Sequence, residues 1–419
     1  MMKKLILLFA GTVVGLQSYA ADLKVAFGDV GGDVAVMKKH FEKFKAKTGH
    51  NVTIVPMPTS TTDQFGQYRL WLSAKNDGID LYLLDVIWAP QLAEHFVDLK
   101  AASQDVVGQH FPSTIQSQTV NEKLVALPYF TDAPMLYYRS DLLEKYKKAV
   151  PKTWQELEET AKLILDQEKK AGNTKLTGIV FQGKAYEGLT CDALEWINSY
   201  GGGQIVEADG KVSVNNPEAI AALTAVKGWI GKIAPEGVLS YQEEEARGVF
   251  QSGNAIFMRN WPYAYNLGQA EDSPVKGKIG VVPLPKGSGE KAKSAATLGG
   301  WNVGVSKYSK HQKQAVELAL FLASAEIQKE NAIQSTHFPT IASLYQDKDV
   351  LAVAPFFTPM LDVLKNSVAR PSAPTKRKYN QVSKEFWTAV QSAINGSKSP
   401  SEALSQLEVT LNKLKGSSW

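Results

Sequence analysis

The chain contains a single cysteine, Cys191, in 419 residues, which excludes an intramolecular disulfide. An oxidising compartment permits disulfides without requiring them, and a chain of this length buries enough apolar surface to fold without one. No nucleophile motif surrounds Cys191. We therefore expect it to pack as a small buried residue.

Motifs for metal binding, cofactor binding and catalysis are also missing. There is no H-E-x-x-H pattern and no G-x-S-x-G elbow, and the loop Gly28–Gly32 carries neither a dinucleotide fingerprint nor a Walker lysine. We predict no metal, no cofactor and no catalytic residue. The six histidines are scattered, and we expect surface or capping roles for them: His40, His50, His95, His110, His311 and His337.

Strong charge of either sign is lacking as well. The net charge is +4 and falls to about +2 if Lys3 and Lys4 are removed with a leader, which is too weak to indicate a nucleic-acid partner. The short basic run 376–378 is interpreted as a solvated turn, and the acidic run 243–245 as a solvated helix face.

Only the N-terminus has the pattern of a secretory signal. Lys3 and Lys4 precede an apolar stretch from Leu5 to Leu16, which is too short to span a bilayer, and cleavage is expected after Ala20. No cysteine follows the cut to carry a lipid anchor. We expect a periplasmic protein.

Strands and helices alternate along the first hundred residues. Strand patterns at Leu23–Phe27, Val52–Val55 and Leu81–Leu84 are separated by helical ones, which predicts a mainly parallel α/β sheet. Ligands gather beyond the carboxyl ends of such strands, where Asp85 lies. The segment 127–134, with two prolines around an acid, indicates a crossing between two lobes.

Two tryptophans stand beside residues that break regular structure. Trp261 is followed by Pro262 and Tyr263, and Trp301 follows two glycines. A flat apolar ring at an element end can belong to the core or can face a ligand. Sugar rings need such surfaces for their C–H faces, and acids or amides for their hydroxyl rims.

Several strings resemble the carbohydrate-binding proteins of ABC importers, and they are most similar to the trehalose/maltose-binding branch. The resemblance covers essentially the whole mature chain and is carried by 80–90, 128–133, 136–139 and 181–190. It implies a two-lobed periplasmic binding-protein fold, with a mainly parallel sheet and flanking helices in each lobe and a ligand cleft at the hinge. The implied division is a signal peptide (1–20), an N-lobe (21–130 and about 280–330) and a C-lobe (about 131–279 and 331–419).

The resemblance also implies which residues contact the sugar. Acids and an arginine would bind hydroxyl groups, polar residues would line the site, and aromatic rings would stack. Asp33 stands where relatives often have the longer Glu, and Phe130 where some have Tyr. The implied ligand-binding set is Asp33, Ser60, Thr61, Asp85, Phe130, Asp132, Tyr186, Trp261, Tyr263, Gly300, Trp301 and Arg370.

The function implied is a monomeric, non-enzymatic receptor that captures a disaccharide-type α-glucoside (trehalose, maltose or sucrose) and delivers it to the membrane subunits of an ABC transporter. Two alternatives remain open from the residues alone. Paired cleft carboxylates could make a secreted glycoside hydrolase or lyase. The same acids could instead serve as counter-ions for a non-sugar solute such as a polyamine.

Overall fold

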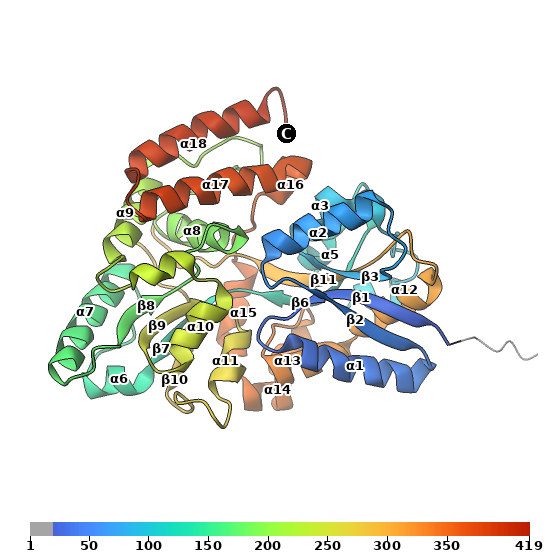
Figure 1. Cartoon of the computed structure of the whole chain (residues 1–419), viewed down its shortest axis with the longest axis horizontal. Coiled ribbons are helices and arrows are strands. Elements are labelled where there is room, and N and C mark those ends of the chain that lie inside the picture. Colours follow the sequence, from blue (N-terminus) through green and yellow to red (C-terminus); the bar gives the residue numbers. More distant parts are fainter. Residues whose placement is uncertain (1–19) are drawn as a thin grey trace, which may run out of the picture.

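The structure, a computed structural model, describes residues 20–419 and consists of two α/β lobes, each built on its own sheet (Figure 1). The predicted signal sequence falls on residues 1–19 and so lies outside the described residues, apart from Ala20. No helix within residues 20–419 combines the length and the apolar character needed to cross a membrane. The predicted two-lobed α/β fold is confirmed.

The first sheet has five strands in the order β2-β1-β3-β11-β6. β1 is parallel to β2 and β3, whereas β11 is antiparallel to both β3 and β6. All its strands therefore point the same way except β11, which follows a strand of the other lobe. Their bounds are β1 (Asp22–Gly28), β2 (Asn51–Met57), β3 (Leu81–Asp85), β6 (Leu127–Asp132) and β11 (Gly299–Val305).

Helices cover both faces of this sheet because residues along each strand alternate between the faces. Val25 joins the apolar cluster that contains Phe41, while its neighbour Ala26 joins the cluster that contains Tyr68 on the opposite face. The covering helices are α1 (Asp33–Thr48), α12 (Gln312–Leu322) and α13 (Ala325–Ser335) on the first face, and α2 (Thr61–Ser73) with α3 (Ala89–Leu92) on the second.

The second sheet has four strands in the order β10-β7-β9-β8, of which only β7 runs against the others. The C-terminal helices α17 and α18 pack on this lobe, against α8 and α9 (Figure 1). The strands are β7 (Met135–Arg139), β8 (Thr177–Val180), β9 (Ala255–Asn260) and β10 (Ile279–Val282). The principal helices are α7 (Trp154–Lys170), α8 (Glu187–Ser199), α9 (Pro217–Trp229), α10 (Glu243–Gln251), α11 (Tyr263–Gly268), α17 (Tyr379–Ile394) and α18 (Pro400–Lys415).

Short elements complete the described part of the chain. Capping boxes open α7 and α18, and Asn216 caps α9 before Pro217. The remaining helices are α4 (Gln104–Val107), α5 (Pro112–Ser117), α6 (Ser140–Lys145), α14 (Lys348–Val353), α15 (Phe357–Lys365) and α16 (Ser372–Thr375), with the 3-10 turns η1 (Ala93–His95), η2 (Glu236–Ser240), η3 (Ala342–Gln346) and η4 (Lys376–Lys378). A small hairpin joins β4 (Thr119–Val120) to β5 (Lys123–Leu124).

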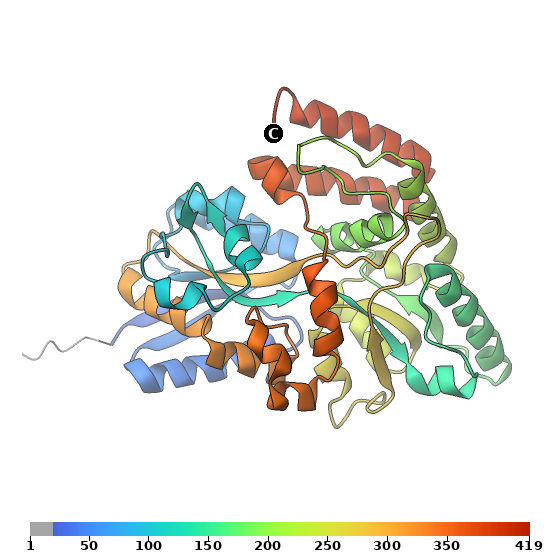
Figure 2. The ribbon, with the colours of Figure 1, turned by 180° about the vertical axis from the view of Figure 1, so that it is seen from behind.

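The chain passes between the lobes at three places. The first is the short step from β6 to β7, and the second runs from β10 to β11. The third, near Val368, pairs with the second, because the Leu298 amide donates to the Val368 carbonyl at 2.9 Å (Figure 2). The division into lobes remains a proposal. Since β10 still belongs to the second sheet, we place the point where the chain returns to the N-lobe after Val282 rather than at about residue 280.

Candidate functional site

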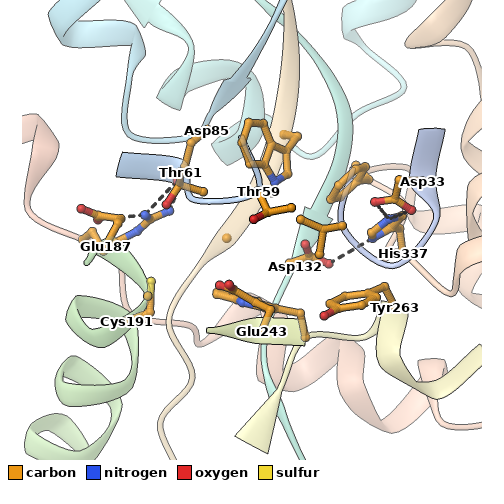
Figure 3. Close-up of a pocket in the computed structure, with 18 residues that line it drawn as sticks. Asp33, Thr59, Thr61, Asp85, Asp132, Glu187, Cys191, Glu243, Tyr263 and His337 are labelled. Atoms are coloured by element: carbon orange, nitrogen blue, oxygen red, sulfur yellow. Dashed lines mark hydrogen bonds and ion pairs between the residues drawn. The ribbon is translucent and has the colours of Figure 1, made fainter. Parts of the chain in front are cut away.

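A cavity lies between the two lobes, at the ends of strands from both sheets (Figure 3). Asp85 is the last residue of β3 and Asp132 the last of β6, while Trp261 directly follows β9. The loops after β1, β2 and β8 supply further walls. The lining residues are Val30, Asp33, Thr59, Thr61, Asp85, Phe130, Asp132, Glu187, Gly188, Cys191, Glu243, Trp261, Tyr263, Gly299, Gly300, Trp301, His337 and Arg370.

All the predicted ligand-binding residues line this cavity except Ser60 and Tyr186. The Ser60 hydroxyl accepts a hydrogen bond from the Asp63 amide at 3.4 Å and so caps α2. Tyr186 precedes α8 and is buried, with its ring packed over Gly188. Neither residue lines the cavity: one side chain serves as a helix cap, and the other packs beside the cavity wall. Their contact with a ligand stays a prediction.

Arg370 links an acid of each lobe. Its guanidinium binds Asp85 through two nitrogens, at 3.0 and 2.5 Å, and binds Glu187 at 3.0 Å. Glu187 also accepts hydrogen bonds from the hydroxyls of Ser383, at 2.7 Å, and Tyr379. Such a two-pronged guanidinium–carboxylate pair fixes geometry as well as charge.

Burial governs the titration of this network. It raises the pKa of Glu187, and the positive charge of Arg370 opposes that rise. Burial also disfavours the charged form of Arg370, but Asp85, Glu187 and the other acidic groups around it together outweigh burial and keep the pKa of Arg370 above its ordinary value. Removing the arginine would therefore leave buried acids without a partner, which is costly.

A second ion-paired group surrounds His337. Its Nε2 atom lies 3.0 and 3.1 Å from the two oxygens of Asp33, and its Nδ1 atom lies 3.7 Å from Asp132 Oδ1. The ring stacks on Phe130 with centroids 3.7 Å apart. Figure 3 shows these groups together on one wall of the cavity.

Two tryptophan rings with firm support complete the walls. Arg259 lies behind Trp261, with its guanidinium carbon 4.5 Å from the ring centroid, and Glu195 fixes that guanidinium from α8. Trp301 meets the buried Trp88 edge-on at 5.5 Å. Both rings are thus held in place and leave surface facing the cavity.

Tyr263 contributes a ring whose hydroxyl is already hydrogen-bonded within the protein. Its side chain is buried, and the hydroxyl donates to Glu244 Oε1 at 2.7 Å. Burial, with help from Glu244, raises the pKa of Tyr263 well above its usual value. The residue therefore lines the cavity with its ring, while its hydroxyl is bound to Glu244 of α10.

Glycines at two points let the walls come close. A Cβ atom on Gly31 would lie 2.2 Å from the Tyr263 ring, and one on Gly299 would lie 2.7 Å from the Trp261 ring. Real side chains do not tolerate such distances. Glycine at these positions therefore allows the loop after β1 and the start of β11 to approach the aromatic rings of the other lobe.

Several lining residues escaped prediction. Glu243 was expected on a solvated face, but it opens α10 at the cavity wall, and burial raises its pKa. The expectation of surface or capping roles is also wrong for His40, His50, His110 and His337, which are buried. Glu187 could have been found, because it lies inside a string that carries the family resemblance. The other unpredicted lining residues are Val30, Thr59, Gly188, Cys191 and Gly299.

Acids outnumber cations on the lining. Five carboxyl groups face two cations, Arg370 and His337, and each cation is already paired with protein carboxylates. Among residues 20–419 no group of three or more metal-ligating side chains gathers. This composition offers many hydrogen-bond acceptors and two rigid apolar faces, which suits a polyol or a sugar.

Comparisons with known proteins point the same way. Residues 28–329 match the family described as bacterial extracellular solute-binding protein. A probable ABC transporter-binding protein of Deinococcus radiodurans is 49% identical over 405 residues, which is 96% of each chain. The maltose-bound structure of T. maritima MalE3 superposes with a TM-score of 0.89 at 40% identity, over 94% of this chain and 100% of that one. A ribitol-bound solute-binding protein of Agrobacterium radiobacter gives 0.82 at 26% identity, over 94% and 98%.

Proposed function

Because this chain belongs to the bacterial extracellular solute-binding protein family, we propose that it is the periplasmic receptor of an ABC sugar importer. Its ligand is a disaccharide-type α-glucoside such as trehalose, maltose or sucrose, held in the interlobe cavity. The observation that carries this proposal is that two supported tryptophan rings and carboxylates from both lobes line one cavity.

Two contributions would drive binding. The faces of a sugar ring would cover Trp261 and Trp301 and release water, at roughly 25 cal/mol for each Å² of apolar surface buried. Hydroxyl groups would donate to ionised acids such as Asp132, and these charge-assisted hydrogen bonds are about twice as strong as neutral ones. The first contribution favours rings, and the second favours hydroxyl-rich ligands.

Contacts across the cleft support a role for lobe closure. The Glu187 amide of α8 donates to the Thr62 hydroxyl of α2 at 3.1 Å, and Arg370 joins Asp85 to Glu187. A ligand that touches both lobes stabilises the closed arrangement by its differential contacts. The closed receptor, acting as a monomer, would then dock on the membrane subunits of the importer.

A melting-shift screen tests the proposal. A ligand that binds only the folded state stabilises it by about 2.7 kcal/mol at a hundredfold excess over Kd. Trehalose, maltose or sucrose is expected to raise the melting temperature, while spermidine and putrescine leave it unchanged. A shift with amines alone would favour the polyamine alternative, to which the excess of acids on the lining lends weight.

Anionic analogues should bind poorly. Both cations of the lining are engaged by protein carboxylates, so neither is free to pair with a carboxylate on the ligand. We expect the uronic-acid form of the preferred disaccharide to bind at least about tenfold more weakly than the neutral form. Calorimetry at two salt concentrations checks this, and equal affinities would contradict the inferred charge balance.

The hydrolase alternative draws on the acids whose pKa burial raises, Asp132, Glu187 and Glu243, because a glycosidase needs such a protonated acid. We expect no glucose release when the purified protein is incubated for a day with each disaccharide. Time-dependent appearance of monosaccharides on thin-layer plates, lost in a Glu243→Gln variant, would instead establish catalysis.

A further inference from the structure

His337 is held at the cavity by its own backbone neighbours. Thr336 adopts a left-handed conformation with φ of 52°, and its hydroxyl donates to the Pro262 carbonyl at 2.8 Å. On the other side, the Phe338 carbonyl accepts from the Thr131 amide at 2.8 Å. The main chain is therefore tied to β6 and to the segment after β9, which leaves the imidazole little freedom.

The imidazole ring is enclosed by groups from two elements. Phe130 covers one face in parallel contact, with 11° between the rings. Asp33, at the start of α1, accepts from Nε2, while Asp132, at the end of β6, faces Nδ1. The charged groups that face the ring are these two carboxylates, one from each element.

The charge state follows from this setting. Burial alone would lower the pKa of His337, but the charges of Asp33 and Asp132 and the hydrogen bond to Asp33 together outweigh it and raise the pKa to about 10. Burial raises the pKa of Asp132, and His337 counteracts that rise, whereas the charge of Asp33 adds to it. At neutral pH the ring is therefore an imidazolium that separates two like charges.

One oxygen of this group remains available. Asp132 Oδ1 is buried and, within residues 20–419, has no hydrogen-bond partner. Its distance of 3.7 Å from His337 Nδ1 is that of an ion pair but too long for a hydrogen bond. The atom belongs to a residue on the cavity lining, so it can accept a hydrogen bond from a hydroxyl group of the ligand.

Building on the proposed function, we propose that His337 is a positioning residue that favours the ionised form of Asp132 and holds Asp33 and Asp132 oriented as acceptors for ligand hydroxyl groups. The histidine acts through the two acids rather than as the main contact of the sugar. Without its charge, burial and the neighbouring Asp33 would raise the pKa of Asp132 further, and Asp132 would take up a proton more readily. Ligand binding would then weaken as the pH falls.

A pH series of binding constants tests this role. For the wild type, the Kd for the best disaccharide of the screen is expected to stay constant from pH 5.5 to 8, because His337 remains charged throughout. His337→Gln keeps a polar side chain without the charge. Its Kd should rise about tenfold at pH 5.5 and return towards the wild-type value by pH 8. His311→Gln, at the start of α12 and away from the cavity, is the matched control and should match the wild type at every pH.

A wild-type profile in His337→Gln would overturn the proposal. A loss of the same factor at every pH would also overturn it, since that result indicates packing alone. Should this variant fail to fold, the imidazole NMR signals of the wild type give an independent test that needs no ligand. A His337 ring that titrates near 6.5 refutes the role, whereas one still protonated at pH 8.5 supports it. If the wild type binds no sugar, the proposed function fails, yet this titration still decides the charge state of His337.

Discussion

Replacing Arg370 with alanine is expected to destabilise the fold and to abolish ligand binding together. The change leaves Asp85 and Glu187 buried without their shared cation, and breaking a buried ion pair in this way costs about 3–5 kcal/mol. It also removes the link between the lobes. We expect a clear fall in melting temperature and a Kd at least about a hundredfold higher in calorimetry.

The stability loss should depend on pH in a defined direction. Without the arginine, the folded-state pKa of Glu187 rises further above its unfolded value, so ionisation costs the folded state stability. The penalty is present above the unfolded pKa and is relieved as the pH falls. The variant should therefore lie closer to the wild type at pH 5 than at pH 8.

Arg377→Ala is the matched control for this variant. That arginine lies on η4 and is exposed, and among residues 20–419 its one ion pair is with the exposed Glu94, at 3.5 Å. Exposed pairs of this kind contribute about 0–1 kcal/mol. If Arg370→Ala binds and melts like Arg377→Ala, the buried network has no role in joining the lobes.

The second large effect is expected from the aromatic walls. Trp301→Ala should weaken sugar binding at least tenfold without unfolding the chain, because the ring is partly open to the cavity. Trp261→Ala should have a similar effect. The affinity of the double variant should be about a hundredfold lower or more, since the loss of each ring removes roughly 1.5–3 kcal/mol of apolar contact. Calorimetry with the preferred disaccharide measures each step.

Trp387→Ala provides the control for loss of a tryptophan. This residue lies on α17, partly buried against the core of the second lobe and away from the cavity. It should alter stability but not affinity. Unchanged affinity in both Trp261→Ala and Trp301→Ala would contradict stacking.

Much of the site could be predicted because its residues stand at element ends. Asp85 closes an apolar strand, and the breakers beside Trp261 and Trp301 mark where regular structure stops. Parallel strands bring their carboxyl ends to one edge, so residues far apart in the sequence meet there. The family resemblance supplied the rest, including Arg370, for which no local pattern gives a reason.

Other features depend on tertiary contacts that local sequence does not encode. A run of three glutamates has the pattern of a solvated face, yet Glu243 turns towards the cavity while Glu244 pairs with Arg247. Nothing near His337 shows that Asp33 and Asp132 will surround it. Ser60 and Tyr186 failed as cavity residues because a hydroxyl that can line a site can equally cap a helix, and a ring can equally pack behind the wall.

The point where the chain returns from the C-lobe to the N-lobe also depends on tertiary contacts. The lobe boundary at about residue 280 was implied by the family resemblance, whereas β10 pairs with β7 and so belongs to the second sheet. The partner of a strand depends on long-range register and burial, which a pattern of four residues does not reveal. We therefore propose that the crossing lies after β10.

A crystal structure of the protein grown with saturating maltose or trehalose tests the central claim most directly. We expect one disaccharide between the lobes, with ring faces against Trp261 and Trp301 and hydroxyl groups within hydrogen-bonding distance of Asp132. An empty interlobe cavity at saturating ligand, or sugar bound elsewhere with these side chains uninvolved, would contradict it.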